Sequence, residues 1–456
     1  ELARDIPSVC LPDDHDVYHG NIWGAGGRAA RELPSNREFP AHYKGFEGHW
    51  KQDGGGYLMP AEFANMVQRT QTSHLPDPYD PTPVEQGITV YYSEMNYGGI
   101  SFAIIEDRKF KSSPSVMVPE GKVVNGFPQN PKFDARKADV PGAILLGERQ
   151  LEFLNNWVED WRGTWMKVAL SQTIFAAVSS YPEDFLTDAK TPELEPAEPG
   201  VIPEGYRMST DMDTNGWPQS GRNKALQAMR RGFTFMIGGD QHLGSIVHHG
   251  VHDWDDAGYS LCVPSVANLW PRRWFPPEPG AEHQEGMPPY TGRYLDGFGN
   301  HITVWAVSNP VISNQEPAEL HDRAPGFGVA RLNKEEQTIT MECWPRYADP
   351  ADQSASQYPG WPLTIPVQEN YGRQPTAYLP TLEFQGLTNP VVQLMEEKTQ
   401  EVVYTIRAKG PSFQPGVFAP GAYEIRIGEP GTERFKVIPG VRAIEGENAE
   451  ILAIEF

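Results

Sequence analysis

Basic residues are scarce in this sequence of 456 residues, in which 38 Lys and Arg stand against 60 Asp and Glu, for a formal net charge of −22. A surface of this sign repels nucleic acid and anionic membranes, so a nuclease or another nucleic-acid-binding function is disfavoured. The simplest interpretation of the charge is a solvated surface that keeps an extracellular protein soluble. A phosphate-bearing substrate would need local positive charge, from bound metal ions or a few inward-facing arginines.

Cysteine is also rare. The three cysteines, Cys10, Cys262 and Cys343, are odd in number and widely spaced, which matches neither a disulfide framework nor a zinc cluster. One bridge is possible if the chain is exported, and buried free thiols are the alternative.

Long hydrophobic runs are missing as well. No stretch approaches the roughly 20 apolar residues of a membrane span, so we expect none. A signal peptide is not found either, because the chain opens with Glu1-Leu-Ala-Arg-Asp5 and has no initiator Met. We therefore expect that an earlier part of the polypeptide has been removed.

Turn-forming and aromatic residues are abundant. The chain has 44 Gly and 43 Pro, which predicts many turns and long ordered loops. Its 12 Trp, 18 Tyr and 20 Phe need a core to bury them, which argues against disorder. The length favours two or three domains.

Apolar periodicity predicts an α/β core. A helix over 147–162 precedes a strand over 166–170, and a helix over 219–231 precedes a buried strand over 233–237. Helix followed by buried strand, twice, is typical of an α/β fold. Further strands are expected over 6–11, 87–92 and 100–105, with proline-rich loops over 183–206 and 270–292.

The last part of the chain has a different sequence pattern. Short alternating strands separated by Gly and Pro turns are expected over 402–407, 423–427 and 435–438. They predict a small β-sandwich over 376–456 attached to a larger domain over 1–375. The sandwich could bind a partner, cap the core or pair two copies of the chain.

Two clusters of Asp and His follow apolar segments. Asp240 and His242 belong to the segment Gly238-Gly-Asp-Gln-His242, after a predicted strand, and would point the same way if that segment stays extended. A carboxylate and an imidazole on one side suit a divalent cation. An ordinary surface loop is the alternative.

The other cluster is Asp13-Asp14-His15-Asp16, with His19 and Asn21 close behind it. Crowded carboxylates raise one another's pKa and cost stability unless a cation is present. An exposed acidic turn is the alternative. Three histidines behind the second cluster, which we expect at the surface or supporting the site, are His248, His249 and His252.

Taken together, these segments resemble the alkaline phosphatase D family of calcineurin-like metallophosphoesterases. The resemblance covers roughly residues 6–345, and the two metal-ligand blocks are its most specific part. The matching blocks are Asp13–Val17 with Asn21, Ile105–Arg108, Leu146–Leu151, Asn215–Pro218 with Arg222, and Gly239–His242.

This resemblance implies a two-sheet sandwich flanked by helices, and hydrolysis of phosphate esters by a water that two metal ions activate. It implies a secreted, periplasmic or cell-surface location. Calcium and iron are the metals it favours, with manganese or zinc as alternatives. Metal ligands would be Asp13, Asp14, Asn21, Asp240 and His242.

The resemblance also implies roles for three other residues. His15 would protonate the leaving group, because a histidine of this block lies near it. Arg108 and Arg222 would orient phosphate oxygens or stabilise loops, and the sequence does not choose between these roles.

One departure from the family pattern is large. Family members carry two further ligand blocks upstream of the Asp-Asp-His-Asp segment, and only 12 residues precede it here. Either a cleaved N-terminal fragment completes the site as a separate chain, or the site is degenerate. The rival functions are a catalytically inactive extracellular module that binds a glycan or peptide, and a structural protein.

Overall fold

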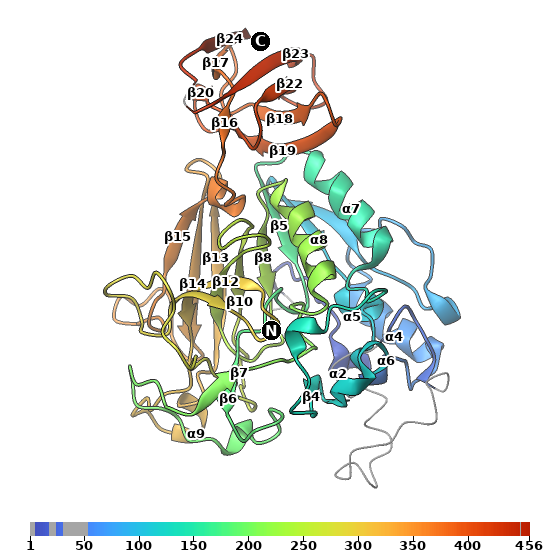
Figure 1. Cartoon of the computed structure of the whole chain (residues 1–456), viewed down its shortest axis with the longest axis vertical. Helices are drawn as coiled ribbons and strands as arrows, with labels where there is room; N and C mark the ends of the chain where they lie inside the picture. Colours follow the sequence, from blue (N-terminus) through green and yellow to red (C-terminus); the bar gives the residue numbers. More distant parts are fainter. Residues whose placement is uncertain (1–4, 18–23, 31–52, 447) are drawn as a thin grey trace.

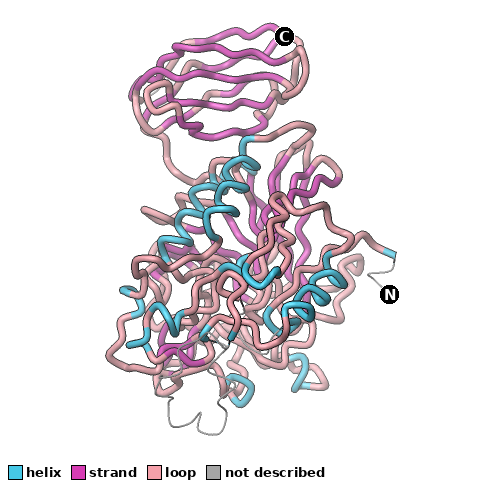
Figure 2. Tube along the Cα trace, turned by 90° about the vertical axis from the view of Figure 1, so that its right-hand side faces the viewer, coloured by secondary structure: helices cyan, strands magenta, loops and turns pink. Residues whose placement is uncertain are grey.

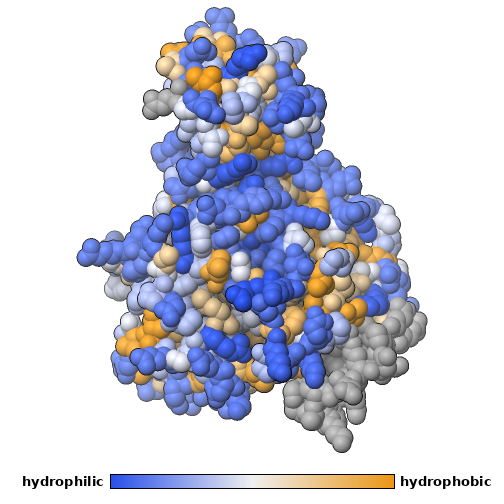
Figure 3. Space-filling model, viewed as in Figure 1, coloured by the Kyte–Doolittle hydropathy of each residue, from blue (hydrophilic) through white to orange (hydrophobic). Residues whose placement is uncertain are grey.

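The computed structural model describes residues 5–17, 24–30, 53–446 and 448–456. Across these ranges the protein is a mixed α/β structure with several sheets, many strands and few helices (Figure 1). No helix in these ranges is both long and apolar enough to cross a membrane. The face seen in Figure 3 is mainly hydrophilic, as expected from the acidic composition.

The largest sheet has eight strands in the order β1-β2-β5-β8-β10-β9-β12-β11. The pairs β2-β5, β5-β8 and β8-β10 are parallel, and the remaining pairs are antiparallel. The bounds are β1 Ser93–Tyr97, β2 Ile100–Ile104, β5 Met166–Leu170, β8 Phe235–Gly238, β9 Ser245–His249, β10 Tyr259–Cys262, β11 Gly292–Leu295 and β12 His301–Val307.

Each face of this sheet packs against a different layer. Ala169 and Met236 share a core with helices α7 (Gly147–Glu159) and α8 (Gln219–Arg230). Their chain neighbours Val168 and Phe235 point the other way, because side chains alternate along a strand, and share a core with strand β14. That strand belongs to a second sheet made of β13 (Gly326–Asn333), β14 (Thr338–Pro345) and β15 (Leu363–Pro366).

From Ala377 onward the chain forms two sheets of its own, seen as a separate set of strands in Figure 2. The larger has the order β19-β18-β22-β23-β16-β21 and the smaller β20-β17-β24. Their strands are β16 Ala377–Tyr378, β17 Thr381–Gln385, β18 Val391–Glu396, β19 Glu401–Arg407, β20 Ser412–Phe413, β21 Gly416–Val417, β22 Gly421–Gly428, β23 Phe435–Glu445 and β24 Ile451–Glu455.

The C-terminal sheets rest on the end of the main body. The rings of Phe233 and Tyr404 meet edge to face with centroids 5.3 Å apart. The guanidinium of Arg407 donates to the Thr164 carbonyl at 2.7 Å. Apolar packing and a buried hydrogen bond therefore join the two parts.

Short elements fill the loops. Besides α7 and α8, the described helices are α2 Asp14–Val17, α4 Ala61–Thr72, α5 Asp107–Phe110, α6 Pro114–Met117 and α9 Ala318–His321. Two-stranded ribbons pair β3 (Val123–Val124) with β4 (Phe127–Pro128) and β6 (Ser180–Pro182) with β7 (Tyr206–Met208). Turns of 3-10 helix cover Glu85–Gly87, Pro119–Gly121, Ala135–Lys137, Thr191–Glu193 and Val367–Asn370.

The expected core elements are confirmed within a few residues: β2, α7, β5, α8 and β8 lie where the periodicity predicts them. Two predicted strands are wrong. Residues 6–11 form no strand, and Ile6 is largely exposed. Residues 87–92 form no strand and lead into β1. Their backbone bonds to side chains and loops, and the Tyr91 amide, for example, donates to the Glu106 carboxylate at 3.0 Å.

The three thiols are free. Cys262 and Cys343 are buried and Cys10 is exposed. Burial raises the pKa of Cys262 to about 12, so this thiol stays protonated and behaves as a small apolar side chain.

Candidate metal centre

Asp13, Asp14 and Asp240 meet at one edge of the large sheet. Asp240 follows the end of β8, and the Pro12 carbonyl accepts a hydrogen bond from Gln172, which follows the end of β5. Strands β5 and β8 are parallel neighbours, so their carboxyl ends lie at the same edge, where α/β sheets gather functional groups. This relation brings residues 12–14 beside Asp240.

The three carboxylates are close enough to share a cation. One oxygen from each of Asp13, Asp14 and Asp240 lies within 4.8 Å of the other two. The Asp14 side chain is only 1% exposed, and in the described part of the chain its carboxylate oxygens accept no side-chain hydrogen bond, although the His15 backbone bonds to them and the His15 ring approaches to 3.5 Å. A buried carboxylate with so few partners is costly, and a bound cation removes that cost. The donor set therefore fits a metal ion.

Arg108 lies among these carboxylates. Its Nη2 is 2.8 Å from Asp240 Oδ2 and 3.5 Å from Asp13 Oδ1, and its Nη1 pairs with Asp213. The guanidinium is fully buried and comes from the short helix α5, which follows β2 at the same sheet edge. One arginine thus partly neutralises the acidic cluster.

The remaining negative charge is not compensated. Burial raises the pKa of Asp13, Asp14 and Asp213 well above the usual range, and Asp240 raises each of them further. Asp240 differs: although burial opposes its ionisation, Arg108 and Arg272 hold its pKa below the usual value. A further cation beside Arg108 would favour the ionised form of these carboxylates.

The backbone around Asp240 is not extended, which corrects the expectation that Asp240 and His242 point the same way. Both residues have positive φ, 65° at Asp240 and 54° at His242. Residues with side chains seldom adopt this left-handed conformation, and it gathers at functional sites. The turn directs Asp240, without His242, into the three-carboxylate cluster.

The two histidines lie next to the carboxylates. His242 donates from Nδ1 to the Trp270 carbonyl at 3.0 Å, which leaves Nε2 as the acceptor nitrogen. Burial and the positive charge of Arg272 lower the pKa of His242, so its ring is neutral, as a metal ligand requires. His15 is 67% exposed, with Nε2 3.5 Å from Asp14 Oδ2. Asn21 lies outside the described residues.

A second arginine, Arg272, went unpredicted. It pairs with Asp211 at 2.8 Å and Asp188 at 3.1 Å, and donates to the Gln241 side chain at 2.9 Å. It thereby fixes the turn between Asp240 and His242. It belongs to the proline-rich loop over 270–292, where periodicity carries no signal for a buried arginine.

The segment before helix α8 supplies the carboxylates that hold both arginines. Asp213 pairs with Arg108 and Asp211 with Arg272, and the Asp213 amide donates to Asp211 at 3.0 Å. The spacing Asp-x-Asp just before the Asn215–Pro218 block was the available signal.

Arg222 is not brought to this cluster. Its guanidinium donates to the carbonyls of Phe175 at 2.7 Å and Gly250 at 2.8 Å. Of the two roles left open for it, these contacts fit loop stabilisation, and a contact with phosphate has no structural support.

The histidines behind the second cluster also lie elsewhere. His248 and His249 are buried in strand β9, where His249 Nε2 lies 2.8 Å from the Ser260 hydroxyl. This corrects the expectation of surface or supporting positions. His252 is exposed.

No protein-family model, curated protein or solved structure matches the chain. Three carboxylates, a neutral imidazole and two arginines suit a cation together with an anionic ligand.

Proposed function

We propose that the protein hydrolyses phosphate esters with the help of bound metal ions, in the manner of the alkaline phosphatase D family that its sequence resembles, on a metallophosphoesterase two-sheet fold. The supporting observation is the convergence of Asp13, Asp14 and Asp240, one oxygen of each lying within 4.8 Å of the other two, with the Asp14 side chain almost fully buried. Monoesters and diesters both fit this chemistry.

The chain's own residues divide the work. Asp13, Asp14 and Asp240 would hold the metal, with His242 beside them. Bound metal ions would supply positive charge for the phosphate and acidify a nearby water. Arg108 would bind phosphate oxygens while Asp213 keeps the guanidinium in place. His15, exposed beside Asp14, would give a proton to the leaving oxygen.

Three carboxylates are few for two ions. We propose that a separate N-terminal fragment of the same precursor brings the remaining ligands that the resemblance implies. Calcium with iron is the pair we favour, and manganese or zinc would suit the same mixed donors. The proposed setting is secreted, periplasmic or at the cell surface.

A second function is favoured by one specific observation. Arg108 already pairs with Asp13, Asp213 and Asp240, so the arginine itself could be the cation of a degenerate site. The protein would then be an inactive extracellular module for binding or assembly.

Metal content and turnover separate these two functions. The purified protein, with any co-purifying fragment identified by intact mass, is analysed for metals and assayed with p-nitrophenyl phosphate and its bis ester. Turnover that EDTA abolishes and metal restores supports the enzyme. A metal-free particle that stays inactive after loading with calcium, iron, manganese and zinc supports the inactive module.

A further inference from the structure

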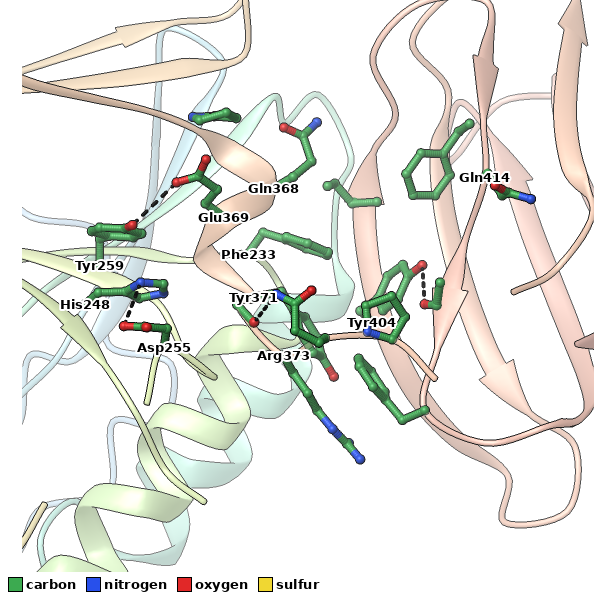
Figure 4. Close-up of a pocket in the computed structure, with 18 of the residues that line it drawn as sticks. Phe233, His248, Asp255, Tyr259, Gln368, Glu369, Tyr371, Arg373, Tyr404 and Gln414 are labelled. Atoms are coloured by element: carbon green, nitrogen blue, oxygen red, sulfur yellow. Dashed lines mark hydrogen bonds and ion pairs between the residues drawn. The ribbon is translucent and has the colours of Figure 1, made fainter. Parts of the chain in front are cut away.

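A cavity of about 620 Å³ lies where the C-terminal sheets meet the main body. Figure 4 shows Tyr259, His248 and Asp255 on one side and Tyr404 and Gln414 of the C-terminal sheets on the other. Its volume falls in the range of about 300–1,000 Å³ usual for small-ligand sites, which often form between domains.

This cavity is separate from the acidic cluster. Phe233, in its wall, comes just before strand β8, and Asp240 comes just after that strand. The two sites therefore lie at opposite ends of β8, and a ligand in the cavity would not touch the carboxylates.

The cavity wall is rich in aromatic rings from both parts of the protein. Half-buried rings come from Trp305 of the main body and from Tyr378 and Phe413, whereas the ring of Phe418 is already in contact with Arg373 and Tyr371. Flat apolar faces of this kind pack against ring-shaped ligands and supply much of the binding area. A ligand with an apolar ring face is therefore favoured.

The charges in the wall cancel. Asp255 pairs with Arg293 at 2.8 Å and accepts from the Thr303 hydroxyl at 2.5 Å. Of the remaining charged residues, Glu369 is negative and Arg373 positive. A net charge on the ligand would thus meet one side chain of its own sign, and a neutral ligand meets no such penalty.

The uncharged polar groups offer several acceptors and one donor, Trp305 Nε1, which has no hydrogen-bond partner among the described residues. Gln374 donates its amide to the Gly372 carbonyl at 3.3 Å and Gln414 to the Asn448 carbonyl at 2.6 Å, which leaves the Oε1 atom of each as an acceptor. Glu369 accepts one long hydrogen bond, 3.4 Å, from Tyr259. The ligand should bring several donors, as a set of hydroxyl groups does.

A ring with an apolar face, no net charge and several hydroxyl donors is a sugar. We propose that the cavity binds a neutral pyranose unit of a glycan, with its C–H face on the aromatic rings and its hydroxyls on Glu369, Gln374 and Gln414. Neither the metal centre nor the proposed hydrolysis is needed for this binding.

The test is calorimetric titration of the full chain with five neutral hexasaccharides: cellohexaose, maltohexaose, xylohexaose, chitohexaose and β-1,4-mannohexaose. At least one should bind with a Kd near or below about 1 mM. Tyr378→Ala and Gln414→Ala should each weaken that binding about tenfold, from the loss of a ring face or an acceptor. Tyr347→Ala, at a ring that is 64% exposed and outside the cavity, should leave it unchanged.

Charged probes complete the experiment. Glu369→Gln keeps an acceptor and removes the charge, so it should leave sugar affinity within about threefold, whereas a cationic ligand would lose far more. Absence of binding by all five sugars at about 10 mM would overturn the proposal. It would also be overturned if choline or sulfate bound more tightly than every sugar, or if the cavity variants left sugar binding unchanged.

Discussion

The guanidinium of Arg108, fully buried, and the carboxylate of Asp240, which is 12% exposed, form an ion pair with Nη2 and Oδ2 2.8 Å apart. The two residues follow different strands, β2 and β8, of the same sheet. Asp13 and Asp213 pair with the same guanidinium, so the carboxylates outnumber their cation. This excess of buried negative charge is the physical basis of the proposed metal centre.

Replacing Asp240 with Asn should lower metal binding and phosphate-ester turnover together, each by at least about tenfold, because the substitution removes the negative charge of one of three converging carboxylate ligands. Metal content by elemental analysis and turnover with p-nitrophenyl phosphate check this. Asp184→Asn, at an exposed carboxylate, is the control and should match the wild type. Loss of turnover with full metal content would mean that Asp240 acts only on the substrate.

His15→Ala should lower turnover of an alkyl phosphate ester, whose leaving group needs a proton, by about a hundredfold or more while the metal content stays close to wild type. The reason is that His15 is exposed at the edge of the cluster, as a residue that meets the leaving group must be. Turnover of p-nitrophenyl phosphate, an activated ester whose leaving group needs no proton, should be affected far less. An equal loss of metal and turnover would contradict this role.

Arg108→Met should destabilise the metal-free protein by about 3–5 kcal/mol, since it leaves several buried carboxylates without their cation. Urea unfolding with EDTA measures this loss. Addition of calcium or manganese should recover a large part of the stability, because the ion replaces the missing charge. If added metal restored nothing, the arginine alone would be the cation of the site.

The lowered pKa of Lys167 predicts that the stability of the protein depends on pH. Burial beside Trp157 and Trp161 lowers its pKa to about 7, whereas an unfolded chain has about 10.4. Between these values the unfolded state binds more protons, so this residue makes stability rise with pH. Lys167→Met should therefore be most stabilising at or below pH 7, and its advantage should shrink towards pH 10. Urea unfolding across this pH range measures the difference; an advantage that does not change with pH would contradict the lowered pKa.

Much of the sheet core could be predicted because local pattern and tertiary environment agree there. Helices α7 and α8 present apolar stripes, and strands β5 and β8 are short uninterrupted apolar runs. The strand predicted over 6–11 was wrong because an apolar stretch does not reveal whether a partner strand is present. The strand predicted over 87–92 was wrong because the Tyr91 amide donates to the Glu106 side chain, which only the fold brings near it.

The candidate site was predictable only in part, for a similar reason. Asp13, Asp14 and Asp240 stood out because they cluster with His directly after apolar segments. Arg272 and Asp213 did not, since their position depends on loops whose course no periodicity records. The left-handed turn at Asp240 was also invisible in the sequence, because Asp adopts that conformation at some positions only, and its surroundings decide which.

The most direct test of the account is an anomalous difference map from a crystal of the protein soaked in manganese. We predict a peak about 2.0–2.6 Å from carboxylate oxygens of Asp14 and Asp240, with Arg108 still held by Asp213. An anomalous map without a peak there, together with ordinary electron density in which Arg108 alone fills the space between the carboxylates, would contradict the proposed metal centre.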